Sequence, residues 1–128
     1  MKKIFVTRKL LKENEIKLKN IFDAKLNPDD KIYSAEEIIA MSNDCDGILS
    51  SVTDPINSDT ILKLSKNIKI IANGAVGFGN IDFKAARSKG IAVTNTPPID
   101  SNPLYSFVGI LVNKNIVMQS ILHLIVMG

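Results

Sequence analysis

The sequence is poor in the residues that mark several common classes of protein. It has no Trp and a single Cys, and aromatic residues make up only 5% of the chain. The lone cysteine, Cys45, excludes an internal disulfide framework and makes a reducing cytoplasm the default location. So few aromatic side chains argue against a surface that stacks nucleic-acid bases. The net charge of +3 is too small and too scattered to predict a nucleic-acid partner.

Long uninterrupted apolar runs are also missing. The first apolar segment covers only residues 4–6, whereas the core of a secretory signal needs about 7–15 apolar residues. A membrane-spanning helix needs about 20 apolar residues, and the apolar stretch 104–127 is interrupted by polar residues at 113–115 and by His123. We therefore expect neither a targeting signal nor an association with membranes.

Charge is nearly absent from the last quarter of the sequence. Within residues 96–128 only Asp100 and Lys114 are charged, although a surface helix of a small domain normally carries a charged face. We expect two parts, an ordered domain over residues 1–98 and an apolar helical tail over 99–128. Such a tail is buried, pairs with a partner, or is unrelated to the domain that precedes it. Its apolar surface predicts self-association.

What is present is a regular alternation of strand and helix patterns. Short apolar runs rich in β-formers predict strands at 3–7, 24–27, 46–50, 68–72 and 91–94. Amphipathic segments separate them, with a capping box at Ser34 and Glu37, a helix cap at Asn57 and a helix stop at Gly90. Parallel strands need crossover connections, so this pattern predicts an α/β class, a flavodoxin-like three-layer domain with a five-stranded parallel sheet.

A glycine-rich segment follows the fourth predicted strand. Residues 73–80 read NGAVGFGN, with three glycines between a strand and a helix. Glycines let a ligand approach the backbone amides closely, and the helix N-terminus adds partial positive charge. The expected ligand is therefore a carboxylate or a phosphate. The glycine order G-x-x-G-x-G differs from the dinucleotide fingerprint G-x-G-x-x-G. A plain tight turn is the alternative interpretation.

A second candidate segment, residues 50–55, reads SSVTDP and follows the third predicted strand. Ligands of parallel α/β sheets bind at the carboxyl ends of the strands, so its hydroxyls and free amides are expected to face the same cleft. Helix capping and turn formation are the alternative role for these residues. Arg8 ends the first predicted strand, where it either attracts an anion or is a solvated surface arginine.

The remaining reactive residue types predict no catalytic, cofactor-binding or metal-binding residue. His123 is the only histidine and has apolar neighbours. Cys45 has no adjacent basic residue to lower the pKa of its thiol, which argues against a nucleophile. Asp44 and Asp46 fall at a helix–strand boundary and are expected to be solvated. Without a cluster of Cys and His, a metal site is not expected.

Four segments together resemble, in the right order, the N-terminal part of the catalytic domain of the D-isomer-specific 2-hydroxyacid dehydrogenases. The likeness covers about residues 3–98, and within the family it is most similar to glyoxylate and hydroxypyruvate reductases. The segments are KIFVTR (3–8), CDGILSSVTD (45–54), LSKNIKIIANGAVGFGNID (64–82) and KAARSKGIAVTNTP (84–97).

The resemblance implies a reaction and a substrate site. Members of the family reduce a small 2-oxoacid to a D-2-hydroxyacid with NAD or NADP. The family likeness places the substrate carboxylate on the main-chain amides of Val76 and Gly77. It places Ser51 and Val52 on the opposite side of the cleft. Gly79 departs from the pattern, because the family usually has an aspartate there.

The resemblance stops near Pro98. The family continues with a dinucleotide-binding domain and with an arginine, a glutamate and a histidine that orient the substrate and transfer the proton, and none has a counterpart here. We therefore expect a truncated dehydrogenase that is inactive alone and does not bind NAD or NADP by itself. The alternative is a non-catalytic module that binds a 2-oxoacid or 2-hydroxyacid. Signalling receiver domains share the strand pattern, but they need acidic residues where this sequence has Thr7, Arg8 and Ser50.

Overall fold

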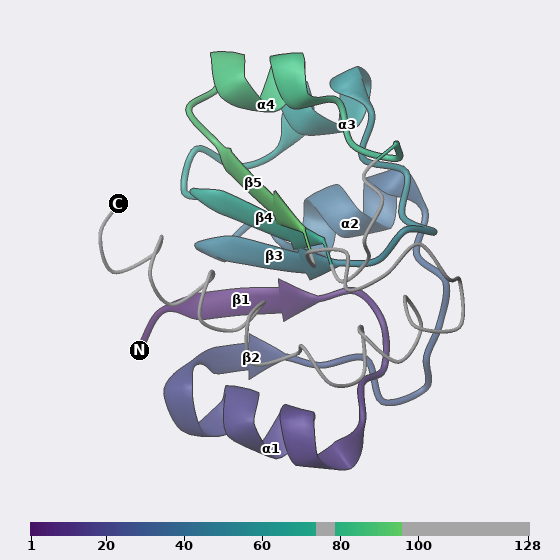
Figure 1. Cartoon of the computed structure of the whole chain (residues 1–128), viewed down its shortest axis with the longest axis vertical. Coiled ribbons are helices and arrows are strands. Elements are labelled where there is room, and N and C mark those ends of the chain that lie inside the picture. The colour runs from purple at the N-terminus through teal and green to yellow at the C-terminus, as the bar shows by residue number, and fades with distance from the viewer. Residues whose placement is uncertain (74–78, 96–128) are drawn as a thin grey trace, which may run out of the picture.

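The fold is seen in a computed structural model that describes residues 1–73 and 79–95 (Figure 1). Strands and helices alternate along this part of the chain. In order they are β1 (Lys3–Val6), α1 (Lys12–Ile21), β2 (Asp23–Lys25), α2 (Ala35–Met41), β3 (Gly47–Ser50), α3 (Ser58–Lys63), β4 (Ile70–Asn73), α4 (Phe83–Ser88) and β5 (Ala92–Asn95).

The strands form one parallel sheet in the order β2-β1-β3-β4-β5. This is the flavodoxin-like order, so the predicted α/β class and the predicted sheet are confirmed. The chain reverses direction along the sheet after β1, where β2 pairs on one side of β1 and β3 on the other. In Figure 1 the strand arrows all point toward the same side, and the carboxyl ends of β1, β3 and β4 lie there together.

Two apolar clusters cover the two faces of the sheet. Successive residues of a strand point to opposite faces, and so Phe5 belongs to one cluster while Ile4 and Val6 belong to the other. The first cluster packs the sheet against α2, α3 and α4, and the second packs it against α1 through Leu18. The sheet is therefore the middle layer of a three-layer domain, as predicted.

The predicted caps start and end the helices. Ser34 and Glu37 form the complete capping box at α2, and the Asn57 side chain accepts a hydrogen bond from Thr60 N–H at the start of α3. Gly90 has a φ of 73°, the left-handed conformation that favours glycine after a helix. These local signals place the helices within the expected segments.

Most strand boundaries lie within one residue of the prediction, and two differ from it by two residues. The predicted strand at 24–27 ends at Lys25, because the buried Asn27 side chain donates to Thr7 O and Lys31 O. The predicted strand at 68–72 begins only at Ile70, because Ile68 N–H is bonded to Ser65 O in a turn. In the first case the strand ends where a side chain bonds to a distant backbone group, and in the second it begins after a local turn.

Some predictions fall outside the described residues. These are the loop with Val76 and Gly77, and the tail over 99–128 with His123. Within residues 1–73 and 79–95, none of the helices is both long and apolar enough to cross a membrane.

Candidate functional site at the carboxyl edge

The strand ends at the carboxyl edge of the sheet carry buried polar residues. Thr7 follows β1, while Ser50 and Asn73 end β3 and β4, and all three are buried. The Ser50 hydroxyl donates to Asn73 Oδ1 over 3.0 Å, so the ends of the two strands are joined by side chains as well as by the sheet. Buried polar groups are stable when they are hydrogen-bonded, and Ser50 and Asn73 meet that requirement by bonding to each other.

Asp54 is the centre of the segment that follows β3. Its side chain is 1% exposed, and Oδ2 accepts a bond from the Thr7 hydroxyl and a 2.8 Å bond from Ser51 N–H. The Ser51 hydroxyl lies 3.4 Å from the same oxygen. Within the described part of the chain, Oδ1 of Asp54 is buried without a hydrogen-bond partner. The carboxyl group thus ties the loop after β3 to the end of β1.

Asn80 joins this loop to the chain that leads into α4. Its Nδ2 donates to Ser51 O and to Asp54 O, each over 3.0 Å, and its Oδ1 accepts from Asn73 Nδ2 over 3.2 Å. Beside it, Ile56 and Ile81 form an isolated parallel bridge. The segments after β3 and β4 are therefore linked both by a side chain and by the backbone.

Arg8 is held by a carboxylate of the protein itself. Its Nε and one Nη bind the two oxygens of Asp30 at 2.8 and 3.0 Å, and its other Nη donates to Thr53 Oγ1 at 3.1 Å. The bond to Asp30 raises the pKa of Arg8, and the same bond lowers the pKa of Asp30 to about 2. Arg8 is consequently an ion-paired arginine at the surface rather than an unpaired anion site.

The predicted substrate-side residues Ser51 and Val52 lie at this edge. Ser51 is half-buried and its amide is bonded to Asp54, which corrects the expectation that the amides of the loop are free. Its hydroxyl lies 2.8 Å from the Thr53 hydroxyl. The Val52 side chain is 56% exposed and thus accessible to a ligand. Val76 and Gly77 lie outside the described residues, so their assigned role stays a prediction.

Sequence reasoning missed Asp54 and Asn80 as the residues that organise this edge. Asp54 precedes Pro55 and was interpreted only as part of a turn or cap. Asn80 follows the last glycine of the segment 73–80 and carries no motif of its own. Their only signal in the sequence is a polar residue in a segment that follows a predicted strand.

The amino edge of the sheet holds Cys45 and the two aspartates that flank it in the sequence, Asp44 and Asp46. Burial raises the pKa of the Cys45 thiol to about 11. Lys25 and Lys3 both bind Asp44, at 2.6 and 3.1 Å, and these bonds hold the pKa of Asp44 well below its usual range. The sequence does not reveal these two lysines near Cys45, which lower the pKa of its thiol less than burial raises it. Asp44 is ion-paired rather than simply solvated.

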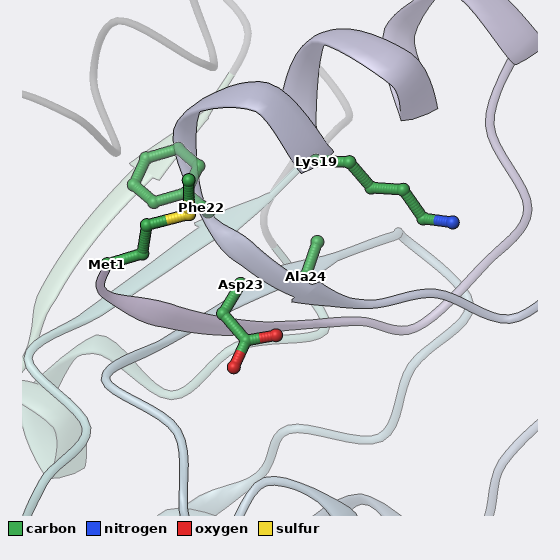
Figure 2. A pocket seen from close by; sticks show the side chains of 5 residues that line it. All are labelled: Met1, Lys19, Phe22, Asp23 and Ala24. Carbon is green, nitrogen blue, oxygen red and sulfur yellow. The ribbon is translucent and has the colours of Figure 1, made fainter.

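The same end of the sheet carries an open depression of about 510 Å³, lined by Met1, Lys19, Phe22, Asp23 and Ala24. Figure 2 shows Met1 beside Phe22, with the charged ends of Lys19 and Asp23 pointing away from each other. A binding site brings a few polar groups to bear on one ligand, and this depression does not. Among the described residues there is also no group of acidic, His or Cys side chains that could hold a metal ion.

A flavodoxin-like sheet with a glycine segment after its fourth strand agrees with the family resemblance in the sequence. The sequence model of the D-isomer specific 2-hydroxyacid dehydrogenase catalytic domain matches residues 4–103. The chain belongs to this family. The match extends slightly beyond Pro98, where the resemblance was expected to stop.

Individual relatives point the same way. A glyoxylate reductase from Korarchaeum cryptofilum is 37% identical over 97 residues, which are 76% of this chain and 29% of that protein. One from Thermococcus onnurineus is 33% identical over 101 residues, 78% of this chain and 30% of that protein. The chain thus spans less than a third of the length of these relatives.

Solved structures share the fold. A putative D-isomer specific 2-hydroxyacid dehydrogenase from Polaromonas superposes with a TM-score of 0.73 at 32% identity, over 77% of this chain and 31% of that one. A 3-phosphoglycerate dehydrogenase from Entamoeba histolytica, solved with NAD⁺, gives 0.62 at 27% identity, over 75% and 33% of the two chains.

Proposed function

We propose that this chain supplies the oxoacid-binding domain of a 2-hydroxyacid dehydrogenase of the glyoxylate reductase type. The observation that carries the proposal is the position of Ser51, which Asp54 and Asn80 hold at the carboxyl edge next to the end of β4. The family activity is the NAD(P)-dependent reduction of a small 2-oxoacid. The glyoxylate reductases that match the chain support this substrate class.

In this proposal the substrate lies between two segments. The amides of Val76 and Gly77 donate to its carboxylate, while Ser51 and the exposed Val52 side chain contact it from the loop after β3. The work of these residues is to bind and orient the oxoacid, which makes the reaction effectively unimolecular once the hydride donor is in place.

The nicotinamide cofactor does not fit the described residues. In dinucleotide-binding folds the turn after the first strand is glycine-rich and leaves its amides free for the pyrophosphate. Here that turn contains no glycine, and Lys9 N–H is bonded to Asp30 Oδ1 over 2.9 Å. We therefore propose that the 128 residues bind the oxoacid but do not turn it over alone. The alternative is a binding module with no catalytic partner.

Calorimetry with glyoxylate, followed by an assay of NADH and NADPH oxidation, tests the proposal. We expect saturable binding of glyoxylate and no consumption of either cofactor above the blank. A folded chain that does not bind glyoxylate rejects the proposal. Saturable cofactor oxidation, lost on His123→Ala, would show instead that the chain is active by itself.

A variant of the glycine segment tests the carboxylate contact. Gly77→Pro removes one amide donor and fixes φ, so we expect a folded protein without oxoacid binding. Gly79→Ala is the matched control, because a Cβ at this position meets no atom within 4 Å. Binding retained by folded Gly77→Pro, or lost equally in Gly79→Ala, rejects the assignment of this contact.

Two further properties belong to the proposal. We propose self-association through residues 99–128, which sizing chromatography of the full chain against a chain ending at Pro98 would test by a change in apparent mass. We also propose a reducing cytoplasm, supported by the free thiol of Cys45. Labelling of this thiol after unfolding in cell extract would detect any oxidised fraction.

A further inference from the structure

The Ser51 peptide is fixed from both sides. Its N–H donates to Asp54 Oδ2 over 2.8 Å, and its C=O accepts from Asn80 Nδ2 over 3.0 Å. Asp54 belongs to the same loop as Ser51, so it shapes the loop internally. Asn80 comes from the other side of the proposed cleft, and so it sets where the whole loop lies relative to the chain after β4.

The Asn80 amide uses both of its N–H donors within the protein. An amide side chain has two N–H donors, and both are used, on Ser51 O and Asp54 O. Its oxygen accepts from Asn73 Nδ2, and Asn73 is fully buried at the end of β4. Three bonds to three different residues leave the side chain one orientation.

The fold does not depend on this side chain for the connection between the two segments. The isolated bridge joins Ile56 N–H to Asn80 O over 3.2 Å and Asp82 N–H to Ile56 O over 3.1 Å, and these are backbone bonds. A substitution at Asn80 leaves this bridge in place. The side chain instead bonds to Ser51, a residue proposed to contact the substrate.

We propose that Asn80 is a positioning residue for oxoacid binding. It does not contact the substrate; it holds the loop with Ser51 and Val52 in one position at the carboxyl edge, so that this loop is ordered before a small carboxylic acid binds. This inference rests on the proposed function. Preorganising a binding loop contributes to affinity by removing the cost of ordering the loop when the ligand binds.

A purely structural role predicts a different outcome from a positioning role. A structural Asn80 affects thermal stability alone, so folded variants would bind the oxoacid with unchanged affinity. A positioning Asn80 affects affinity at temperatures where the variant is fully folded. The measurement must therefore compare variants that lose similar stability at different places in the domain.

Asn57→Ala is the matched control for Asn80→Ala. The Asn57 side chain accepts two hydrogen bonds, from Thr60 N–H and from the Thr60 hydroxyl, at 3.0 and 3.1 Å. It caps α3 and has no bond to Ser51 among the described residues. Asn80→Asp is the second test variant. It keeps the oxygen that accepts from Asn73 and replaces the two donors by an oxygen facing the carbonyls of Ser51 and Asp54.

The experiment titrates the full-length, isotope-labelled chain with glyoxylate and follows the amide resonances of Ser51 and Val52, with a thermal melt of each variant. We expect glyoxylate affinity to fall about tenfold or more in Asn80→Ala and in Asn80→Asp, because the loop must be ordered on binding. We expect Asn57→Ala to keep wild-type affinity despite a lower melting temperature.

Each outcome decides between the two proposals. Wild-type affinity in a folded Asn80→Ala or Asn80→Asp overturns the positioning role and leaves the proposed function intact. An equal loss of affinity in Asn57→Ala overturns it too, because the effect would then follow stability rather than position. A wild-type chain whose resonances do not shift saturably with glyoxylate overturns the proposed function, and the role of Asn80 with it.

Discussion

The two edges of the sheet use polar groups in opposite ways. At the amino edge, Asp44 is half-exposed and bound by the charged ends of Lys3 and Lys25. At the carboxyl edge, Asp54 is buried and bound by a hydroxyl and a backbone amide. Exposed ion pairs are screened by water and salt, whereas a buried carboxyl group requires donors at defined positions. The described polar groups of the carboxyl edge are thus held at defined positions by buried hydrogen bonds, and this is the edge proposed to bind the substrate.

The largest effect is expected when the buried carboxyl group is removed. Asp54→Ala leaves the Thr7 hydroxyl and the Ser51 N–H without their acceptor. We expect the free energy of unfolding to fall by about 2–4 kcal/mol, since unsatisfied buried donors keep their full desolvation cost. Urea unfolding measures the change.

Asp54→Asn sharpens this prediction, because it keeps one oxygen that can accept both bonds. It should destabilise the domain less than Asp54→Ala does. Asp59→Ala, an exposed acidic residue in the first turn of α3, is the control and should change stability little. Equal stability of Asp54→Ala and the wild type would contradict the role of Asp54.

A smaller effect is expected at the amino edge, where Lys89 is the exception to the weak, exposed pairs. Its Nζ donates to three carbonyls at the end of α3, those of Ile61, Leu62 and Leu64, at 3.0, 3.2 and 2.7 Å. Lys89→Met keeps the aliphatic length and removes these bonds. We expect a loss of about 1–2 kcal/mol, because a cation satisfies the free carbonyls at a helix C-terminus.

Lys84→Met replaces an exposed lysine of α4, the helix that ends just before Lys89, and serves as the control. Thermal melts of the two variants against the wild type compare the sites. If both variants melt at the same temperature, the three bonds to α3 add nothing to stability, and the amino edge has no exception.

The smallest effect is expected for the exposed ion pair of the carboxyl edge, between Arg8 and Asp30. The pKa of Asp30 is lowered from 3.8 to about 2 in the folded protein by the hydrogen bond from Arg8. The ionised form therefore stabilises the fold fully above the unfolded pKa, and this contribution is lost as pH falls from 3.8 through about 2.

Asp30→Asn should flatten the acid limb of the stability profile slightly, as thermal melts between pH 5 and pH 2 would show. Asn tolerates the φ of 51° at this position, so backbone strain does not confuse the result. Asp29→Asn, also exposed, is the control. A change as large as that of Asp54→Ala would mean that exposed pairs stabilise this edge as strongly as buried groups do.

Local signals made the fold predictable. The capping box at Ser34 and Glu37 can be recognised from two residues three positions apart. The helix end at Gly90 can be recognised from one glycine, which lacks the Cβ that disfavours a positive φ. The alternation of short apolar runs with amphipathic segments defined the parallel sheet, because only crossover helices connect parallel neighbours. Boundaries failed where a side chain such as Asn27 ended a strand by bonding to a distant backbone group.

The candidate site was less predictable because its contacts are long-range. Asp54 accepts a hydrogen bond from Thr7, which lies 47 residues earlier in the sequence. Asn80 donates to Ser51 O, which lies 29 residues earlier. Arg8 was expected either to attract an anion or to be solvated, yet it is paired with Asp30. The sequence shows that polar residues follow the strands, but only the packed domain determines which of them bind one another.

The isolated bridge between Ile56 and Ile81 has a consequence for the order of folding. The bridge joins segments on either side of α3 and β4, so we expect it to form after these elements, at a loop-closure cost that local helices do not bear. Ile56→Val and Ile81→Val should therefore speed unfolding while leaving the refolding rate nearly unchanged. The proposed substrate edge would then be the last part of the domain to assemble and the first to open.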